Sequence, residues 1–382
     1  MFYAVIGINY GDEGKGLATD CLTLEGHNLV VRHNGGAQAG HTVEKEGKRF
    51  VFHELSSGSF NGADTYWATT FFPDLYKLEE EINGFAEVSG AHVKIYASPD
   101  ASVTLLYDVY LNQKIEEARG KAKHGSCGMG IWEATRRTRD GFGLTIREIA
   151  DLSAAEIAAR LASIEKEYVP VRLAKYSITE SLELETLKYA ELLKNVLAKH
   201  VTLVEDEKAF FFSYDNVVFE SGQGLLLDVD RRDLWPHTTC SRTNIINPVS
   251  ILGKCGLRLD EAVYVTRAYL TRHGAGPFNE DPALHFEDET NQPNPWQDSI
   301  RFGRHSSVTS LIRRITDDVR DNCPYEVRTS IFLTHLNETE DLVLTEEGDI
   351  PLKEFVKTAH DSGIGRLYLS RTKYSKDVIS DE

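Results

Sequence analysis

The sequence predicts an α/β fold with a large, mainly parallel central sheet flanked by helices. Short apolar runs typical of buried strands alternate along the 382 residues with longer segments of helical spacing. Strands separated by helices favour parallel pairing within one sheet. This length exceeds the roughly 250–300 residues at which a single core stops growing. Helical and loop subdomains are therefore expected around the central sheet, within one domain spanning residues 1–382.

The first strand is predicted at Phe2–Gly7, an apolar run that ends at a glycine, as a buried parallel strand does. Asn28–Arg32 follows the same pattern. Later strands are expected at Lys94–Ala97, Asn216–Glu220, Ala262–Ala268 and Thr329–Thr334.

Helices are predicted at Asp74–Glu81, Thr145–Ile164 and Thr179–Leu197. In the last segment leucines recur at roughly helical spacing, and Thr179 is the expected N-cap. Residues 145–200 are therefore expected to form a helical subdomain.

Charge and cysteine content restrict the partners and the compartment. A formal net charge of −17 repels nucleic acid and anionic membranes, although a local basic pocket can still bind a small anionic nucleotide. No apolar run approaches the ~20 residues that span a bilayer, and the first residues lack a basic leader, which predicts no signal peptide. The five cysteines include no Cys-x-x-Cys pair. Reduced thiols and a cytoplasmic location are the simplest expectation.

The segment Gly-Asp-Glu-Gly-Lys-Gly at Gly11–Gly16 directly follows the first predicted strand. Glycines let a backbone approach a phosphate closely, and a following helix N-terminus favours an anion. Lys15 adds positive charge, and Asp12 can act as a base or hold Mg²⁺. It is not a Walker A motif, because Gly16 stands where Ser or Thr would follow the lysine. The alternative is a plain strand-to-helix turn with solvated charges.

A second glycine-rich segment, Gly35–Val43, follows the second predicted strand. Its histidine, His41, is flanked by small residues, so a ligand could approach it closely. An imidazole there can donate a proton or a hydrogen bond to developing phosphate charge. The alternative is a turn histidine without a chemical role.

Together these segments resemble the adenylosuccinate synthetase family, whose usual forms are Gly-Asp-Glu-Gly-Lys-Gly and Gly-Gly-x-Asn-Ala-Gly-His-Thr-Val. Further similar segments follow in the same order: Phe52–Gly58, Gly125–Ile131, Phe219–Asp228 and Thr271–Phe278. The last matches the family's Thr-Arg-x-Gly-Ala-Gly-Pro-Phe closely. The resemblance spans nearly the whole chain and implies a P-loop-NTPase-related version of the predicted fold.

The resemblance implies a purine-biosynthetic ligase that couples a 6-oxopurine nucleotide to aspartate, with Mg²⁺ and with GTP or ATP as phosphoryl donor. It assigns Asp12 to remove the N1 proton and hold Mg²⁺ together with the Gly40 carbonyl, Lys15 to neutralise the transferred phosphoryl group, and His41 to stabilise the leaving phosphate. The nucleotide-binding positions that it implies are Gly11, Glu13, Gly14, Gly16, Gln38, Gly40, Thr42, Ser126, Cys127, Arg139, Gln223, Thr239, Arg272, Thr334 and Asn337.

The segment that resembles the family's amine-binding loop departs from it. The family form is Thr-Thr-Gly-Arg-x-Arg-Arg, and residues 291–303 here retain one guanidinium, Arg301. Asn and Gln do not replace bidentate Arg–carboxylate pairing. The amine is therefore aspartate held differently, through Arg301, Arg272 and Arg304, or it is another amine. The candidate amine-binding residues are Asn291, Asn294, Gln297 and Arg301.

Two further departures concern the donor base and the partner subunit. The family's Thr-Lys-Leu-Asp reads guanine with its Asp, and here the segment is Thr334-His335-Leu336-Asn337. An Asn offers both a donor and an acceptor, as an adenine edge requires, which predicts ATP or dATP as readily as GTP. Family members are homodimers in which an Arg reaches the neighbour's nucleotide, and the candidates here are Arg136, Arg137 and Arg139.

The alternatives belong to different classes of function. Related phage 2-aminoadenylosuccinate synthetases act on dGMP and carry Ser at the loop Asp position, so the retained Asp12 favours an IMP-like base. The same activation of dGMP or GMP, or coupling to another amine, is the second enzymatic hypothesis. A nucleotide-binding regulator without turnover is the non-enzymatic one.

Overall fold

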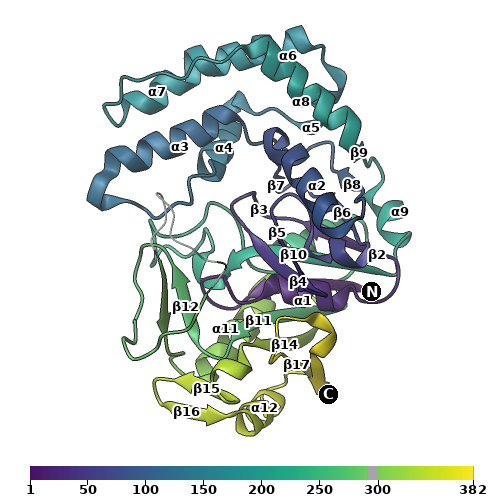
Figure 1. Cartoon of the computed structure of the whole chain (residues 1–382), viewed down its shortest axis with the longest axis vertical. Helices are drawn as coiled ribbons and strands as arrows, with labels where there is room; N and C mark the ends of the chain where they lie inside the picture. The colour runs from purple at the N-terminus through teal and green to yellow at the C-terminus, as the bar shows by residue number, and fades with distance from the viewer. Residues whose placement is uncertain (289, 291–298, 382) are drawn as a thin grey trace.

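The computed structural model describes residues 1–288, 290 and 299–381, and in these ranges its centre is a ten-stranded sheet (Figure 1). The strand order is β18-β17-β14-β11-β1-β10-β2-β6-β8-β9, and neighbours pair parallel except for β17 with β18. The bounds of these strands are β1 Phe2–Gly7, β2 Asn28–Arg32, β6 Asp64–Trp67, β8 Ile95–Ala97, β9 Val201–Leu203, β10 Asn216–Gly224, β11 Glu261–Arg267, β14 Arg328–Thr334, β17 Arg366–Leu369 and β18 Ile379–Asp381.

Side chains of the central strand β1 alternate between two apolar layers, as strand geometry requires. Ala4 and Ile6 lie in a cluster with side chains of α10 (Ile246–Lys254), α11 (Val308–Asn322) and α12 (Leu352–Asp361). Val5 lies in a second cluster with Ala18 of α1 (Lys15–Leu22). Burial on both faces explains the continuous apolar run of this strand.

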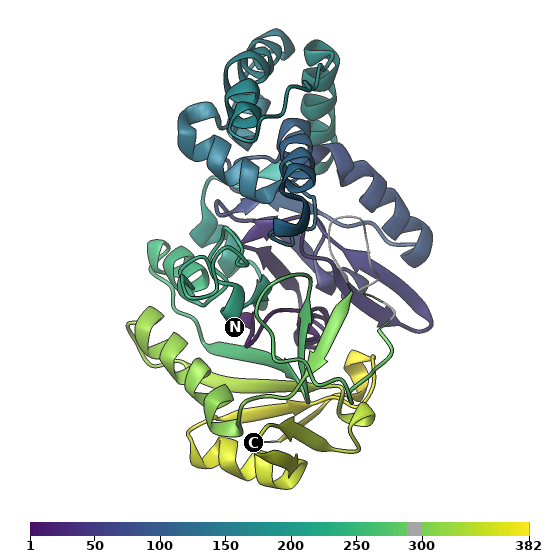
Figure 2. The same cartoon turned by 90° about the vertical axis from the view of Figure 1, so that its left-hand side faces the viewer.

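Helices gather at one end of the molecule, beyond the β9 edge of the sheet (Figures 1 and 2). Leu111, Leu161 and Leu193, on three of these helices, share a third buried cluster. The helices from this part of the chain are α2 Leu75–Ser89, α3 Leu106–Arg119, α4 Ile131–Arg137, α5 Ile146–Asp151, α6 Ala154–Ser163, α7 Val169–Ala174, α8 Thr186–His200 and α9 Glu207–Phe212.

Short strand pairs surround the central sheet. The antiparallel pairs are β4 (His41–Lys45) with β5 (Lys48–Phe52), β12 (Leu270–His273) with β13 (Ile300–Gly303), and β15 (Leu342–Thr345) with β16 (Gly348–Pro351). A parallel pair joins β3 (Gly35–Gly36) to β7 (Phe71–Phe72).

The predicted α/β class and all the predicted strands are confirmed, and β10 continues to Gly224. The predicted helix Thr145–Ile164 is wrong as a single element, because Ser153 caps a new helix by accepting from the Glu156 N–H. Thr179 is wrong as an N-cap, since α8 begins at Thr186.

Within the described ranges, no helix combines the length and the apolar character needed to cross a membrane.

Candidate functional site

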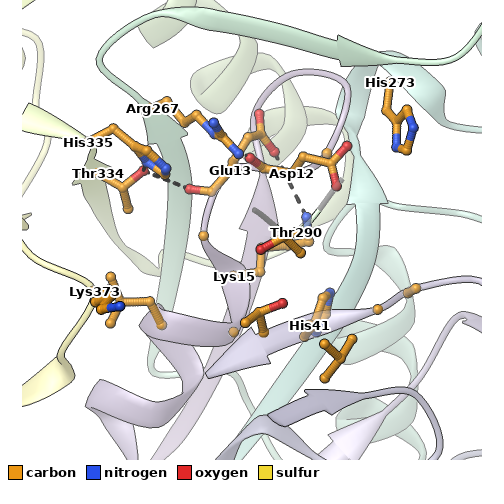
Figure 3. A pocket seen from close by; sticks show the side chains of 18 of the residues that line it. Asp12, Glu13, Lys15, His41, Arg267, His273, Thr290, Thr334, His335 and Lys373 are labelled. Carbon is orange, nitrogen blue, oxygen red and sulfur yellow. Dashed lines mark hydrogen bonds and ion pairs between the residues drawn. The ribbon is translucent and has the colours of Figure 1, made fainter. Parts of the chain in front are cut away.

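A cavity of about 800 Å³ lies at the carboxyl ends of the central strands (Figure 3). Its wall is built from the segments that follow β1, β3 and β14, from the ends of β10, β11 and β12, from the β4–β5 hairpin and from residues 372–374. Parallel neighbours bring their carboxyl ends to one edge of a sheet, so turns that are far apart in sequence converge there.

The glycine-rich segment Gly11–Gly16 lines this cavity. Gly11 and Gly14 have φ angles of 93° and 96°, the left-handed region that favours glycine. A Cβ on Gly14 would also lie 2.9 Å from Cγ2 of Thr334 on β14. Helix α1 begins at the next residue, Lys15, so a helix N-terminus stands at the cavity wall, an arrangement that favours a phosphate.

A buried acid–base pair lies in this segment. Lys15 Nζ is 4.0 Å from Glu13 Oε2, and both side chains are almost fully buried. Glu13 Oε1 accepts from the Asn9 backbone N–H at 2.5 Å, whereas Oε2 has no hydrogen-bond partner in the described part of the chain. Burial raises the pKa of Glu13 to about 7 and lowers the pKa of Lys15. An anion bound beside Lys15 would favour its charged form.

His41, at the start of β4, is held by a carboxylate from the middle of the central strand β10. Its Nδ1 lies 2.7 Å from Glu220 Oε1 on β10, and the other oxygen of Glu220 accepts from Arg32 Nη1 at 3.0 Å. Ser57 donates both its hydroxyl and its backbone N–H to the same carboxylate. Burial alone would raise the pKa of Glu220, but His41 and Arg32 hold it below its ordinary value. An ionised Glu220 fixes the proton on Nδ1, which leaves Nε2 of His41 for a ligand.

Side chains at two strand ends hold backbone carbonyls of the segment Gly11–Gly16 in place. Arg267, the last residue of β11, donates from Nε to the Asp12 carbonyl at 2.6 Å and from Nη2 to Asp288 at 3.0 Å. Thr334 of β14 donates to the Glu13 carbonyl at 2.9 Å. Figure 3 shows the Asp12 carboxylate directed away from Thr334 and His335.

Residues of the β4–β5 hairpin form polar contacts at the rim of the cavity. Glu44 lies 2.6 Å from Lys373 Nζ in the segment that follows β17, and 3.6 Å from Arg49 Nε. Arg49 Nη2 donates to Thr290 Oγ1 at 2.9 Å. The hairpin thus joins the C-terminal segment to the segment after β12.

Asp12 and the Gly40 carbonyl, the predicted metal ligands, belong to residues that line this one cavity. Among the described residues no three His, Cys, Asp or Glu side chains gather to hold a metal ion. Oxygen donors from one or two protein groups, completed by phosphate oxygens, are the usual environment of Mg²⁺. The donor set therefore fits Mg²⁺ bound together with a nucleotide.

Many sequence-predicted site residues converge on the cavity, and others do not. Those that line it are Gly11, Asp12, Glu13, Gly14, Lys15, Gly16, Gln38, Gly40, His41, Thr42, Gln223, Thr334 and Asn337. Gln38 Nε2 approaches Gln223 Oε1 at 3.4 Å, and Oε1 of Gln38 is buried without a hydrogen-bond partner within the described ranges.

Ser126, Cys127, Arg139 and Thr239 do not line the cavity. Ser126 donates to Asn112 Oδ1 on α3 at 2.8 Å, so the segment 124–130 is anchored to the helical end of the molecule. Arg139 is 71% exposed and lies 3.9 Å from Asp140.

The arginines expected around the amine are engaged elsewhere and do not line the cavity. Arg301 donates to the carbonyls of Gly274 and Gly276, and Arg272 donates to those of Pro277 and His237. Arg304 pairs with Asp281 and Asp349. The remaining amine-binding candidates, Asn291, Asn294 and Gln297, lie outside the described residues.

Sequence reasoning missed several groups of this site. Arg32, Glu220 and Arg267 each stand in or at the end of an apolar strand run, and a buried charge there is a signal that could have identified them. His273, His335 and Lys373 also line the cavity. His273 and His335 lie within two of the segments that resemble the family, which is a signal that could have identified them, whereas nothing local in the sequence distinguishes Lys373 from a surface residue.

Comparison with known proteins agrees with this geometry. The sequence profile described as adenylosuccinate synthetase matches residues 4–293. An adenylosuccinate synthetase from Psychrobacter cryohalolentis is 33% identical over 291 residues, covering 74% of this chain and 65% of the relative. One from Pseudomonas aeruginosa is 32% identical over 298 residues, with the same coverage. The match therefore spans slightly less than two thirds of the length of these curated relatives.

Solved structures show the same fold. The fully ligated adenylosuccinate synthetase from Plasmodium falciparum superposes with a TM-score of 0.74 at 18% identity, covering 100% of this chain and 99% of that one. The cyanophage S-2L succinoaminodeoxyadenylate synthetase bound to dGMP and dATP gives a TM-score of 0.61 at 18% identity, covering 99% of this chain and 94% of that one.

Proposed function

This chain belongs to the adenylosuccinate synthetase family, and from that premise we propose that it is a C–N bond-forming ligase. It uses a nucleoside triphosphate to phosphorylate the 6-oxygen of an IMP-like purine nucleotide and then couples aspartate at C6. A 6-oxo group leaves poorly, and phosphorylation makes its displacement by an amine feasible. The observation that carries the proposal is the convergence of Asp12, Lys15 and His41 on one cavity.

The three residues supply different parts of the chemistry. Asp12 takes the N1 proton of the purine, which makes the 6-oxygen a nucleophile toward the γ-phosphorus. Lys15 and the N-terminus of α1 neutralise charge on the transferred group. His41, oriented by Glu220, hydrogen-bonds through Nε2 to the leaving phosphate. Mg²⁺, held by Asp12 and the Gly40 carbonyl, would supply further positive charge to the phosphates when bound.

The two ends of the cavity suit two nucleotides. Gln38 and Gln223 provide amide groups for the purine that is activated. Thr334, His335 and Asn337 line the cavity on the β14 side, where the base of the donor would lie. An Asn amide can pair with an adenine edge, and the cyanophage synthetase of similar fold was solved with dATP. The donor is therefore proposed to be ATP or dATP as well as GTP.

A homodimer in the cytoplasm completes the proposal. Arg139 is strongly exposed and does not line the cavity of its own chain, so it is available to the nucleotide of a neighbouring copy. The neutral Asn, Gln and Ser side chains of the segment 291–303 leave an amine other than aspartate as the second enzymatic candidate.

The direct test incubates the purified chain with Mg²⁺, one triphosphate, one purine nucleotide and one amino acid, with products read by mass spectrometry. IMP, GMP and dGMP are compared with each of GTP, ATP and dATP, first with aspartate. The expected product is the succinyl-amino adduct of IMP with release of one phosphate. A chain that binds nucleotides but releases no phosphate with any combination would instead be a regulator.

A further inference from the structure

Asp12 has an unusual backbone conformation for a residue with a side chain. Its φ is 57°, in the left-handed region that glycine adopts freely and other residues rarely adopt. Such a conformation persists only where the surrounding structure holds it, and it is found most often at functional sites. Under the proposed function Asp12 takes the N1 proton of the purine, so the direction of its carboxylate depends on this backbone angle.

Arg267 holds the backbone of Asp12. Its Nε donates to the Asp12 carbonyl at 2.6 Å, and the residue is only 6% exposed. The hydrogen bond goes to the backbone and not to the carboxylate, and Figure 3 shows the carboxylate extending away from the guanidinium. Arg267 therefore constrains Asp12 without occupying the oxygens that would take the proton.

The rest of the guanidinium is anchored to the protein. Nη1 donates to the Tyr269 hydroxyl at 3.1 Å, and Nη2 donates to Asp288 at 3.0 Å. The backbone carbonyl of Arg267 in turn accepts from Nε2 of His305 at 3.0 Å. A planar guanidinium with a contact at each of its three nitrogens has a fixed orientation, which a flexible ammonium would not keep. The Asp12 carbonyl is thus held by a rigid group.

We propose that Arg267 is a positioning residue, which holds Asp12 so that its carboxylate reaches N1 of the purine. This inference rests on the proposed function. A misplacement of about 1 Å at a reacting group costs about 10²-fold in rate, so Arg267→Met should lower kcat by about that factor. KM for the purine nucleotide and for the triphosphate should stay within about threefold, because the lost contact serves the transition state and not substrate binding.

A double-mutant cycle separates positioning from a direct role in the chemistry. If Arg267 acts through Asp12, it has no carboxylate to position in Asp12→Ala. Adding Arg267→Met to Asp12→Ala should therefore change the residual kcat by less than about twofold. An arginine that acted directly on the phosphates would add its full loss in both backgrounds.

Stability is measured separately by chemical denaturation, because Arg267→Met also removes the cation of a buried pair with Asp288. If Arg267→Met does not fold, Arg267→Lys keeps the charge and carries the same cycle, with a kcat below that of the wild type. The control is Arg172→Lys, which replaces a buried arginine that contacts Glu133 through two nitrogens and does not line the cavity. It should lose stability and keep kcat within about twofold.

Three results would each overturn the inference: wild-type kcat in the folded variant used for the cycle, a defect confined to KM, or a full additional loss in the Asp12→Ala background. Failure of the proposed function looks different, because the wild-type chain would then release no phosphate with any combination of substrates.

Discussion

Replacing Glu220 by Gln tests whether Glu220 orients His41 for its proposed role. Glu220 accepts from His41 Nδ1 at 2.7 Å, from Arg32 Nη1 at 3.0 Å and from two groups of Ser57. An amide of the same shape removes the charge, and its NH₂ group cannot accept from Nδ1. The variant therefore no longer enforces the tautomer of His41 that leaves Nε2 free to contact a ligand. We expect kcat to fall by about 10²- to 10⁴-fold, the range of rate enhancement by a positioned acid or base.

The same substitution should also destabilise the fold. Arg32 is only 1% exposed and loses its anionic partner, and breaking a buried pair costs about 3–5 kcal/mol. The folded pKa of Glu220 is depressed, so its contribution is present above its unfolded pKa and is lost only as pH falls through the lower folded value. The stability gap between wild type and Glu220→Gln should therefore be full at neutral pH and narrow in strong acid.

Phosphate release at saturating substrates measures kcat, and chemical denaturation measures the free energy of unfolding. The control is Glu54→Gln, another fully buried glutamate, which does not line the cavity and whose pKa burial raises well above its ordinary value. It should leave kcat within about twofold, because its carboxyl accepts from the Asp74 backbone N–H and lies outside the cavity wall. A folded Glu220→Gln chain with wild-type kcat would refute the role given to the His41–Glu220 pair.

Asp12→Ala should lower phosphate release at least about 10²-fold while triphosphate binding persists; equal rates in a stopped assay would exclude Asp12 as the base. Glu54→Gln should raise Tm, and the increase should be larger at pH 8 than at pH 5. The pKa of Glu54 is raised in the folded state, so the stability of the wild-type chain falls as the pH rises through that pKa. Scanning fluorimetry measures the difference in Tm, and a difference that does not change with pH would contradict the prediction. Gly14→Ala should cost about 1–3 kcal/mol, since its φ is 96° and its Cβ would meet Thr334; an unaltered denaturation midpoint would argue against the strained loop.

The central sheet could be predicted because its strands are buried on both faces. Phe2–Gly7 is a continuous apolar run for that reason, and Thr329–Thr334 has the apolar centre Ile331–Leu333, whose side chains enter both clusters. Such runs are visible without an alignment. The glycines after β1 likewise predicted a turn between that strand and a helix, since the left-handed backbone angles of Gly11 and Gly14 are tied to residue type.

The start of α8 was mispredicted because Leu182 and Leu184 have the spacing of a helix face without being helical. Both pack against the helical cluster from a segment that lies outside any helix. The break between α5 and α6 could have been predicted from the sequence, because Ser153 and Glu156 have the spacing of a capping box and form one in the structure.

Sequence reasoning could not predict in which direction a long side chain of the site points. Arg272 and Arg301 have the right type and position for binding a carboxylate, yet both are turned to backbone carbonyls of the turn 274–277. Local sequence does not distinguish a guanidinium that supports a turn from one that faces a substrate.

The rim contacts of the β4–β5 hairpin have a kinetic consequence. Lys373, Glu44, Arg49 and Thr290 form a chain of polar contacts from the C-terminal segment to the segment after β12, and Lys373 is 56% exposed. Water and dissolved ions compete with such pairs, so ionic strength weakens them. Residence times of bound nucleotides should therefore shorten in concentrated salt, even where the buried chemistry behind the rim is unaffected.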